Sequence, residues 1–401
     1  WEVRTINSFC SVKTGPFGSM LHAEDYVAKG TPIVTTEHFK NGILPLVGKD
    51  IPQVGIEDLK RMSSYTLTKD DIVFSRVGSV DINALVTVRQ KGWLFSGRVL
   101  RVRPFKQTDS LYLHYGLLKH SVRSDIVSRA VGLTMASINT KILGETELSL
   151  PPLNEQHRIA SALTSIDNLI SSLGKQIEKK KNIKQGAMQQ LLTGKTRLKG
   201  FSEPWVKRKL GDNATIQRGG SPRPIEAYLT TNRDGINWIK IGDVRPNDKF
   251  IRHTVEKIIP EGISHSRQVY KGDFILSNSM SFGRPYILDI DGCIHDGWLV
   301  IKDYSNTYDM DFLYYILSSD TVFEQYIAMA AGSSVKNLNK EKVANVMLFA
   351  PQSLAEQRAI ATILNKMDNE ITALETKKAK YEAIKQGMMQ QLLTGKIRLI
   401  S

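Results

Sequence analysis

The sequence contains little cysteine and no long apolar run. Cys10 and Cys293 are its only cysteines among 401 residues, and they lie far apart in the chain. Such a pair provides neither a disulfide framework nor a CxxC metal site, and we expect both to be core thiols. No apolar stretch approaches the roughly 18 residues that a transmembrane helix needs, and no signal-peptide pattern opens the chain. These absences favour a cytoplasmic protein that has no membrane partner.

The common catalytic and nucleotide-binding motifs are also missing. The sequence has no GxGxxG or HExxH pattern, and its eight histidines are scattered. The TGKT segment at residues 193–196 resembles the end of a phosphate-binding loop, but Gln189 stands where that loop requires glycine. We therefore interpret Gly194, and Gly395 in a second copy of the segment, as caps at helix C-termini. The sequence predicts no catalytic residue, no metal site and no cofactor bound by this chain.

Positive charge, in contrast, is abundant. Lysine and arginine number 54 and aspartate and glutamate 40, which gives a net charge of +14 and a pI near 9.5. This excess requires an acidic partner, and nucleic acid is the most common one. Hydrophobic content of 41% and charged content of 23% are those of a globular protein, and 401 residues suit two or three domains.

An internal duplication organises the chain. The segment IKQGAMQQLLTGKTRL at residues 183–198 returns as IKQGMMQQLLTGKIRL at residues 384–399, with 14 of 16 residues identical. The same offset of 201 carries Glu155 onto Glu356. A looser repeat relates KDDIVFS at residues 69–75 to KGDFILS at residues 271–277. The chain therefore contains two copies of one module, each followed by a long helix.

Short apolar segments separated by turn residues fill the first module. We predict strands near residues 31–35, 71–74, 84–88 and 99–102, and a helix near residues 111–119. Asp71 and Asp273 precede apolar strands in the two modules, where turn formation is their expected role. The pattern is that of an α+β fold. The predicted order is a module at residues 1–150, a helix at 151–198, a second module at 199–350 and a second helix at 351–401.

Both helical segments carry an apolar seam whose spacing of three and four residues is typical of a coiled coil. The seam residues are Ile159, Leu163, Ile166, Ile170, Leu173, Ile177, Ile360, Leu364, Met367, Ile371, Leu374 and Tyr381. We expect the two helices to pair antiparallel, giving pseudo-two-fold symmetry with one module at each end. A helix over residues 155–192 would be roughly 57 Å long, and it would be a rigid spacer between two DNA-binding modules.

Three kinds of loop recur in the modules and are candidates for DNA contact. They are GPFGS (15–19) with RGGSPR (218–223), SRVGS (75–79) with SNSMSFGR (277–284), and GLTMASIN (132–139) with GSSVKNLN (332–339). Glycine lets backbone approach phosphate, arginine binds phosphate or guanine, and small polar side chains can bond base edges. Plain surface turns are the alternative interpretation. The predicted DNA-binding residues are Ser19, Ser75, Arg76, Ser79, Arg98, Arg218, Ser221, Arg223, Lys240, Arg245, Ser277, Asn278, Arg284 and Lys336.

These motifs carry a family resemblance over essentially the whole chain. The QQLLTGK endings at residues 189–195 and 390–396, the Glu-Gln pairs beginning at Glu155 and Glu356, and the KxDxxxS strands resemble those of the DNA-specificity (S) subunits of type I restriction-modification systems. The resemblance implies two target recognition domains, each recognising one half of a split double-stranded DNA site. It also implies that the paired helices set the gap between the half-sites.

The resemblance further implies the partners. Two methyltransferase subunits carrying S-adenosylmethionine would dock on the helices, and two restriction motor subunits, which use ATP and Mg²⁺, can join them. Two alternatives remain at the level of sequence. One is a stand-alone DNA-binding or architectural protein that dimerises through its coiled coil, and the other is an enzyme such as a nuclease with an unrecognised site.

Overall fold

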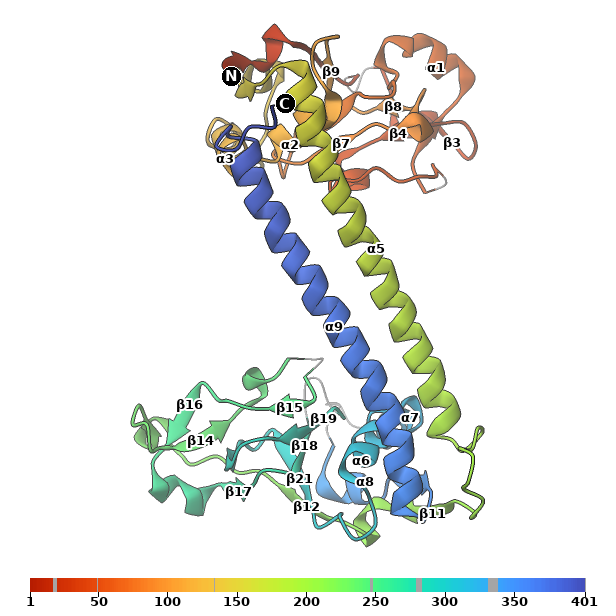
Figure 1. Cartoon of the computed structure of the whole chain (residues 1–401), viewed down its shortest axis with the longest axis vertical. Helices are drawn as coiled ribbons and strands as arrows, with labels where there is room; N and C mark the ends of the chain where they lie inside the picture. Colours follow the sequence, from red (N-terminus) through yellow and green to blue (C-terminus); the bar gives the residue numbers. More distant parts are fainter. Residues whose placement is uncertain are drawn as a thin grey trace. The chain divides into compact units, whose positions relative to one another are not determined.

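The computed structural model describes residues 1–16, 20–48, 50–132, 134–245, 248–278, 283–330 and 338–400. It divides into two compact units. Unit 1 comprises Trp1–Gly174 and Thr376–Ser401, and unit 2 comprises Lys175–Glu375. Two helices of 39 residues, α5 (Leu153–Leu191) and α9 (Leu354–Leu392), are drawn in yellow-green and blue in Figure 1. Each of them contributes one part to each unit.

The described part of unit 1 contains two four-stranded sheets, a two-stranded ladder and four short helices. The antiparallel first sheet, in the order β2-β9-β6-β7, consists of β2 (Cys10–Thr14), β9 (Val99–Pro104), β6 (Ile72–Ser75) and β7 (Asn83–Leu85). The second, in the order β3-β5-β4-β8, consists of β3 (Tyr26–Val27), β5 (Gln53–Val54), β4 (Thr31–Val34) and β8 (Leu94–Phe95). The ladder pairs β1 (Glu2–Thr5) with β10 (Glu147–Leu150). The helices are α1 (Ile56–Arg61), α2 (Ser110–Leu117), α3 (His120–Ser128) and α4 (Thr140–Gly144).

Unit 2 repeats this plan with more strands. Its first sheet, in the order β12-β21-β18-β19-β15, consists of β12 (Thr215–Arg218), β21 (Trp298–Lys302), β18 (Phe274–Ser277), β19 (Pro285–Leu288) and β15 (Phe250–Ile251). Its second, in the order β13-β16-β14-β20-β17, consists of β13 (Leu229–Thr230), β16 (Glu256–Ile258), β14 (Ile236–Ile239), β20 (Gly292–Ile294) and β17 (Arg267–Val269). The ladder pairs β11 (Val206–Lys209) with β22 (Met347–Ala350). The helices are α6 (Met310–Leu317), α7 (Asp320–Ala330) and α8 (Lys340–Ala344).

The central strand of each first sheet is buried on both faces. In β6, Ile72 and Phe74 belong to one apolar cluster and Val73 belongs to another. In β18, Phe274 and Ile275 divide in the same way. Successive side chains of a strand point to opposite faces, so each first sheet is covered by helices on one side and by the second sheet on the other.

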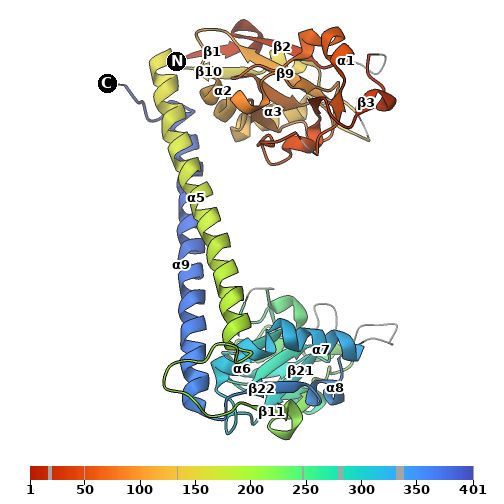
Figure 2. The same cartoon turned by 90° about the vertical axis from the view of Figure 1, so that its right-hand side faces the viewer.

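Helices α2 and α6 connect the sheets to the long helices. Leu113 of α2 packs in the cluster of the first sheet, whereas Tyr115 packs in a cluster with Ile159 of α5. In unit 2 the corresponding Leu313 and Tyr315 share one continuous core with both long helices. Figure 2 shows α6 between β21 and the lower parts of α5 and α9. The short helix therefore fixes each module on the helix pair.

The long helices pack against each other within each unit. In unit 1, Leu163 near the start of α5 lies in one apolar cluster with Leu392 at the end of α9. In unit 2, Leu364 near the start of α9 lies in one cluster with Leu191 at the end of α5. The start of one helix meets the end of the other in both units, so the paired segments run antiparallel. All twelve seam residues named above are buried or half-buried.

Most predicted elements are present. β4, β6, β9 and α2 lie where the sequence predicts them, and Cys10 and Cys293 are buried free thiols. The strand predicted at residues 84–88 is wrong at its end, because β7 stops at Leu85 and Val88 begins a 3-10 helix. Gly194 and Gly395 have φ angles of +68° and +71°, the left-handed conformation of a helix cap, which confirms that interpretation.

Candidate DNA interface

In unit 1 the predicted DNA-binding loops meet at one edge of the first sheet. β2 and β6 end at this edge and β9 begins there, since Thr14 pairs with Leu100 and Ser75 pairs with Val99. The N–H of Gly15, which follows β2, donates to Val99 O at 3.1 Å. Gly15, the end of β6 and the start of β9 are therefore neighbours, although they are far apart in sequence.

Close packing of these loops requires glycine at two equivalent positions. A Cβ atom on Gly15 would lie 2.1 Å from Ser96 O, and a Cβ atom on Gly219 in unit 2 would lie 2.1 Å from His295 O. The sequence suggested that these glycines admit a phosphate. In the structure the close neighbour is a protein carbonyl, so loop packing already accounts for glycine at both positions.

Arg76 joins the loops of unit 1. Its Nη1 donates to Gly97 O at 2.8 Å and its Nε donates to Ile138 O at 3.2 Å. Asn278 holds the equivalent position in unit 2, where its Nδ2 donates to Asp296 O at 2.9 Å. Each side chain thus bridges from the end of the central strand to the loop before β9 or β21. Both act as connectors between loops.

The other predicted residues of unit 1 differ in exposure. Ser75 is buried at the end of β6. Ser79 and Arg98 are exposed on neighbouring loops. The loop that carries Ser79 is held by Gly78, whose N–H donates to Ala136 O at 2.8 Å. Arg98 and Ser79 are therefore the side chains of this group that solvent, or DNA, can reach directly.

The same edge recurs in unit 2 and gathers more positive charge. β12 and β18 end there with Arg218 and Ser277, and β19 begins there after Arg284. β15 runs parallel to β19, so the loop that carries Arg245 enters the sheet at this edge as well. Ser277 is buried, whereas the three arginines are exposed.

Asp296 was not predicted from the sequence, and it contacts several side chains at this edge. Its carboxylate accepts from Ser221 Oγ at 3.0 Å and lies 2.9 Å from His295 Nε2 and 3.7 Å from Arg223 Nη2. Its backbone carbonyl accepts from Arg218 Nε at 3.2 Å. One residue therefore orients three of the predicted DNA-binding side chains. The repeat gave no signal for it, because the equivalent loop of unit 1 has Ser96.

Lys240 lies beside His295 because their strands are neighbours in the second sheet. β14 and β20 are parallel, so Lys240 and His295 leave the sheet side by side, and His295 N–H donates to Ile239 O at 3.1 Å. Lys240 Nζ pairs with Glu256 at 2.5 Å. A cavity of about 540 Å³ lies here and is lined by Ser221, Pro222, Arg223, Pro224, Ile225, Glu226, Leu229, Trp238, Lys240, Glu256, His295 and Asp296.

Two predicted residues, Ser19 and Lys336, lie outside the described residues. The remaining twelve lie along the equivalent edges of the two units. Five of them are buried, or are half-buried and bonded to loop carbonyls or to Asp296, whereas Arg218 and Arg223 contact Asp296 but stay exposed. Those five are Ser75, Arg76, Ser221, Ser277 and Asn278. The edges therefore combine exposed cations with the polar side chains that hold the loops.

The repeated Glu-Gln pairs form junctions that the sequence did not explain. In unit 1, Arg398 donates to both carboxylate oxygens of the buried Glu155 at 2.8 Å, and Trp1 Nε1 donates to the same group at 3.0 Å. In unit 2, Arg197 and Trp205 bind Glu356 in the same manner. Each helix tail is thereby fastened to the start of the other helix.

The Arg398 guanidinium also lowers the pKa of the Glu155 carboxyl. Its hydrogen bonds, with those of the Trp1 indole and the Leu399 N–H, lower the pKa of Glu155 to about 2 despite the opposing effect of desolvation. Gln156 completes the junction, because its Oε1 accepts from Asp109 N–H at 2.9 Å at the start of α2. The repetition of Glu155 and Arg197 at an offset of 201 was the signal that could have predicted these pairs.

Within the described ranges, no helix combines the length and the apolar character needed to cross a membrane. In the same part of the chain, no group of three or more histidine, cysteine, aspartate or glutamate side chains is placed to hold a metal ion.

Comparison with known proteins identifies the family. The type I restriction modification DNA specificity domain matches the chain twice, over residues 1–184 and 202–386. These matches span most of the sequence, and the chain belongs to this family. The two matches also agree with the duplicated α+β modules and their long helices.

Individual relatives resemble the chain over its whole length. The MjaX and MjaVIII specificity subunits of type I restriction enzymes from Methanocaldococcus jannaschii are 28% and 27% identical to it. The matches cover 100% of this chain and 94% and 93% of those proteins. The crystal structure of a type I restriction-modification S subunit from M. genitalium has a TM-score of 0.61 at 18% identity, covering 98% of this chain and 96% of that one. This structure shows that the fold is shared.

Proposed function

We propose that this chain is the DNA-specificity subunit of a type I restriction-modification complex and that each unit recognises one half of a bipartite DNA site. One observation carries the proposal: the same sheet edge is built twice and displays different exposed side chains. Ser79 and Arg98 occupy the edge in unit 1, whereas Arg218, Arg223 and Arg284 occupy it in unit 2. A shared scaffold with different contact residues suits two half-sites of different sequence.

The side chains at these edges divide into two roles. We assign direct DNA contact to Ser79, Arg98, Arg218, Arg223, Lys240, Arg245 and Arg284, because arginine and lysine bind phosphates and arginine can also bind guanine through two hydrogen bonds. We assign positioning of the loops to Ser75, Arg76, Ser221, Ser277 and Asn278. Ser19 and Lys336 remain proposed contacts from the sequence alone.

The long helices suit a spacer. At 1.5 Å per residue, the 39 residues of α5 or of α9 extend over about 58 Å. We propose that their length sets the number of base pairs between the half-sites and that their exposed faces dock two methyltransferase subunits. In this assembly S-adenosylmethionine belongs to the methyltransferase subunits, and ATP and Mg²⁺ belong to two restriction motor subunits. The chain described here supplies recognition rather than catalysis.

Co-expression with type I methyltransferase subunits from the same source genome tests the proposal. We expect the two proteins to copurify and to methylate a randomised plasmid library at a motif of two short sequences separated by a gap of fixed length. A continuous motif, or a chain that stays free of the methyltransferase, would contradict the proposal. Purified chain that binds DNA alone with the same specificity would favour an architectural protein. Specific cleavage by the chain and Mg²⁺ alone would indicate a nuclease.

A further inference from the structure

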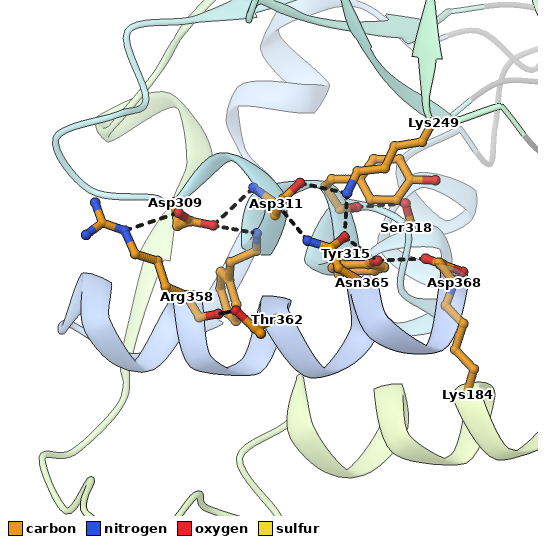
Figure 3. Close-up of polar contacts among 12 residues, drawn as sticks. Lys184, Lys249, Asp309, Asp311, Tyr315, Ser318, Arg358, Thr362, Asn365 and Asp368 are labelled. Carbon is orange, nitrogen blue, oxygen red and sulfur yellow. Dashed lines mark hydrogen bonds and ion pairs between the residues drawn. The ribbon is translucent and has the colours of Figure 1, made fainter. Parts of the chain in front are cut away.

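A closed ring of polar side chains fastens the edge of unit 2 to its long helix (Figure 3). Lys249 Nζ donates to Asp311 Oδ1 at 2.6 Å and to Asn365 Oδ1 at 2.8 Å. Asn365 Nδ2 completes the ring by donating to Asp311 Oδ2 at 2.7 Å. The three residues come from the segment before β15, from α6 and from α9, so the ring joins three elements.

The ring continues into the contact between the long helices. Tyr315 OH lies 2.6 Å from Asp368 Oδ2 and 2.8 Å from Asn365 Oδ1. Its proton is shared between these two acceptors, and burial together with Asp368 raises the pKa of the Tyr315 hydroxyl. Lys184 of α5 donates to the other oxygen of Asp368 at 2.5 Å. A chain of hydrogen bonds thus runs from Lys249 to both long helices.

Unit 1 repeats only the second half of this chain. Tyr115, Asp167 and Lys385 form the equivalent contact, with Tyr115 OH 2.7 Å and Lys385 Nζ 2.6 Å from Asp167. Leu111 and Thr164 stand at the positions of Asp311 and Asn365. In the part of unit 1 that the structure describes, the first sheet ends at β7, the counterpart of β19. The ring around Lys249 therefore accompanies the extra strand β15 of unit 2.

Strand β15 needs such an anchor because its ladder is very short. Only Phe250 and Ile251 pair with β19. The Lys249 side chain is 17% exposed, and its ammonium lies 4.8 Å and 4.9 Å from the ring centroids of Tyr314 and Tyr315. Desolvation and the aromatic faces strengthen its pairing with Asp311 relative to a surface ion pair. Asp248, the neighbour of Lys249, donates its N–H to Arg245 O at 3.1 Å and accepts from Arg245 N–H through its carboxylate at 2.9 Å. Lys249 is thus the polar anchor that holds Asp248, and through it Arg245, beside α6 and α9.

We propose that Lys249 is a positioning residue that fixes the Arg245 loop to α9, so that unit 2 recognises its half-site from an edge held by the helix. This inference rests on the proposed function. Lys249 itself is directed toward α6 and α9 (Figure 3), and it acts on DNA through the loop. Recognition should depend on Lys249 only at the half-site of unit 2, since unit 1 has no equivalent ring among its described residues.

The test uses the complex assembled with its methyltransferase subunits and carrying Lys249→Met. The half-site of unit 2 is first identified as the one whose recognition changes in Arg223→Ala. Affinities are then measured for cognate DNA and for DNAs altered in one half-site at a time. We expect discrimination at the half-site of unit 2 to fall about tenfold, the range of one base contact, while discrimination at the other stays within about twofold.

Two matched variants separate positioning from stability. Lys207→Met removes one exposed charge from β11 of the same unit, and it should change neither half-site. The triple variant Lys249→Met, Asp311→Leu and Asn365→Thr places the residues of unit 1 at positions 311 and 365, so no carboxylate at position 311 is left without its cation. It should keep the thermal unfolding midpoint of the unaltered complex and still lose discrimination at the half-site of unit 2.

The outcomes are distinct. Unchanged discrimination in the triple variant, or equal losses at both half-sites in Lys249→Met, overturns the inference about Lys249. Restoration of discrimination by Lys249→Arg supports it, because a guanidinium can also bridge Asp311 and Asn365. If the unaltered complex shows no split recognition site, the proposed function fails instead.

Discussion

Lys385 Nζ lies 2.6 Å from Asp167 Oδ1 and joins α9 to α5 within unit 1. The duplication repeats this pair in unit 2, where Lys184 Nζ lies 2.5 Å from Asp368 Oδ1. The two lysines are related by the offset of 201, and so are the two aspartates. A charged residue within an apolar seam selects the register in which its partner lies opposite. The pairs therefore specify how the helices align in each unit.

Replacing Lys385 by methionine should weaken the helix contact in unit 1. The pair is partly exposed, with side chains 21% and 35% accessible, so we expect a loss of about 1 to 2 kcal/mol in the free energy of unfolding. Hydrogen exchange at the start of α5, followed by mass spectrometry, measures this loss locally. In a double-mutant cycle, Asp167→Asn should add little to Lys385→Met. Fully additive effects would show that the two side chains do not interact.

Acid should release the junction at Glu155 in unit 1. The pKa of this carboxyl is about 2 in the folded chain, below its ordinary value of 4.5, so the charged form stabilises the fold. The contribution is complete above pH 5 and disappears as the pH falls toward 2. Thermal unfolding midpoints of the unaltered chain should therefore fall over this range. Glu155→Gln should lower the unfolding midpoint at neutral pH and make the midpoint less dependent on pH below 5. The control Glu147→Gln, at an exposed position, should leave the dependence of the midpoint on pH unchanged.

The buried carboxylate of Asp71 should make Arg103 important for stability. Arg103 binds it through two hydrogen bonds of 2.6 Å and 2.7 Å, and Asp71 also accepts from Thr68 N–H, which confirms its predicted role in a turn. Arg103→Met should cost about 3 to 5 kcal/mol because a buried charge loses its partner. Chemical denaturation of the complex measures this cost. Arg123→Met, which breaks a more exposed pair with Asp81, should cost less than about 1 kcal/mol.

Substitution of single arginines should affect one half-site at a time. Arg98→Ala is expected to reduce discrimination at one half-site and Arg223→Ala at the other. Each loss should amount to about 1 to 3 kcal/mol if the arginine binds a base and should be uniform across sequences if it binds phosphate. Competition binding with singly altered DNAs distinguishes these cases. Arg89→Ala, an exposed arginine away from the edge of unit 1, serves as the control.

Lengthening both helices should lengthen the gap. Insertion of one heptad at matched positions in α5 and α9 preserves the seam and adds about 10.5 Å, or about three base pairs. Methylation mapping should then show unchanged half-site sequences with a longer gap between them. Altered half-sites with the original gap would refute the spacer role.

The elements that the sequence predicted well are those with local signals. The seam from Ile159 to Ile177 repeats every three or four residues, and α5 and β6 lie close to their predicted bounds because periodicity reports burial directly. The contacts of Arg76 and Asp296, in contrast, could not be predicted from local patterns. Arg76 bonds Ile138, 62 positions away, and Asp296 bonds Ser221, 75 positions away, so no local pattern records either contact. Gly15 and Gly219 were candidates from the sequence, but the carbonyl oxygen that each one packs against depends on the fold.

The duplication, the α+β modules, the long helices and the excess of positive charge could all be predicted before folding is considered, because repetition, periodicity and composition are properties of the chain. Which side chains at the sheet edges face outward, and which hold loops together, depends on the folded arrangement. Strand pairing brings segments from distant parts of the chain to one edge, and there Arg98 is exposed while Arg76 is engaged with carbonyl groups. The same folding step created the ring at Lys249, whose partners lie 62 and 116 positions away.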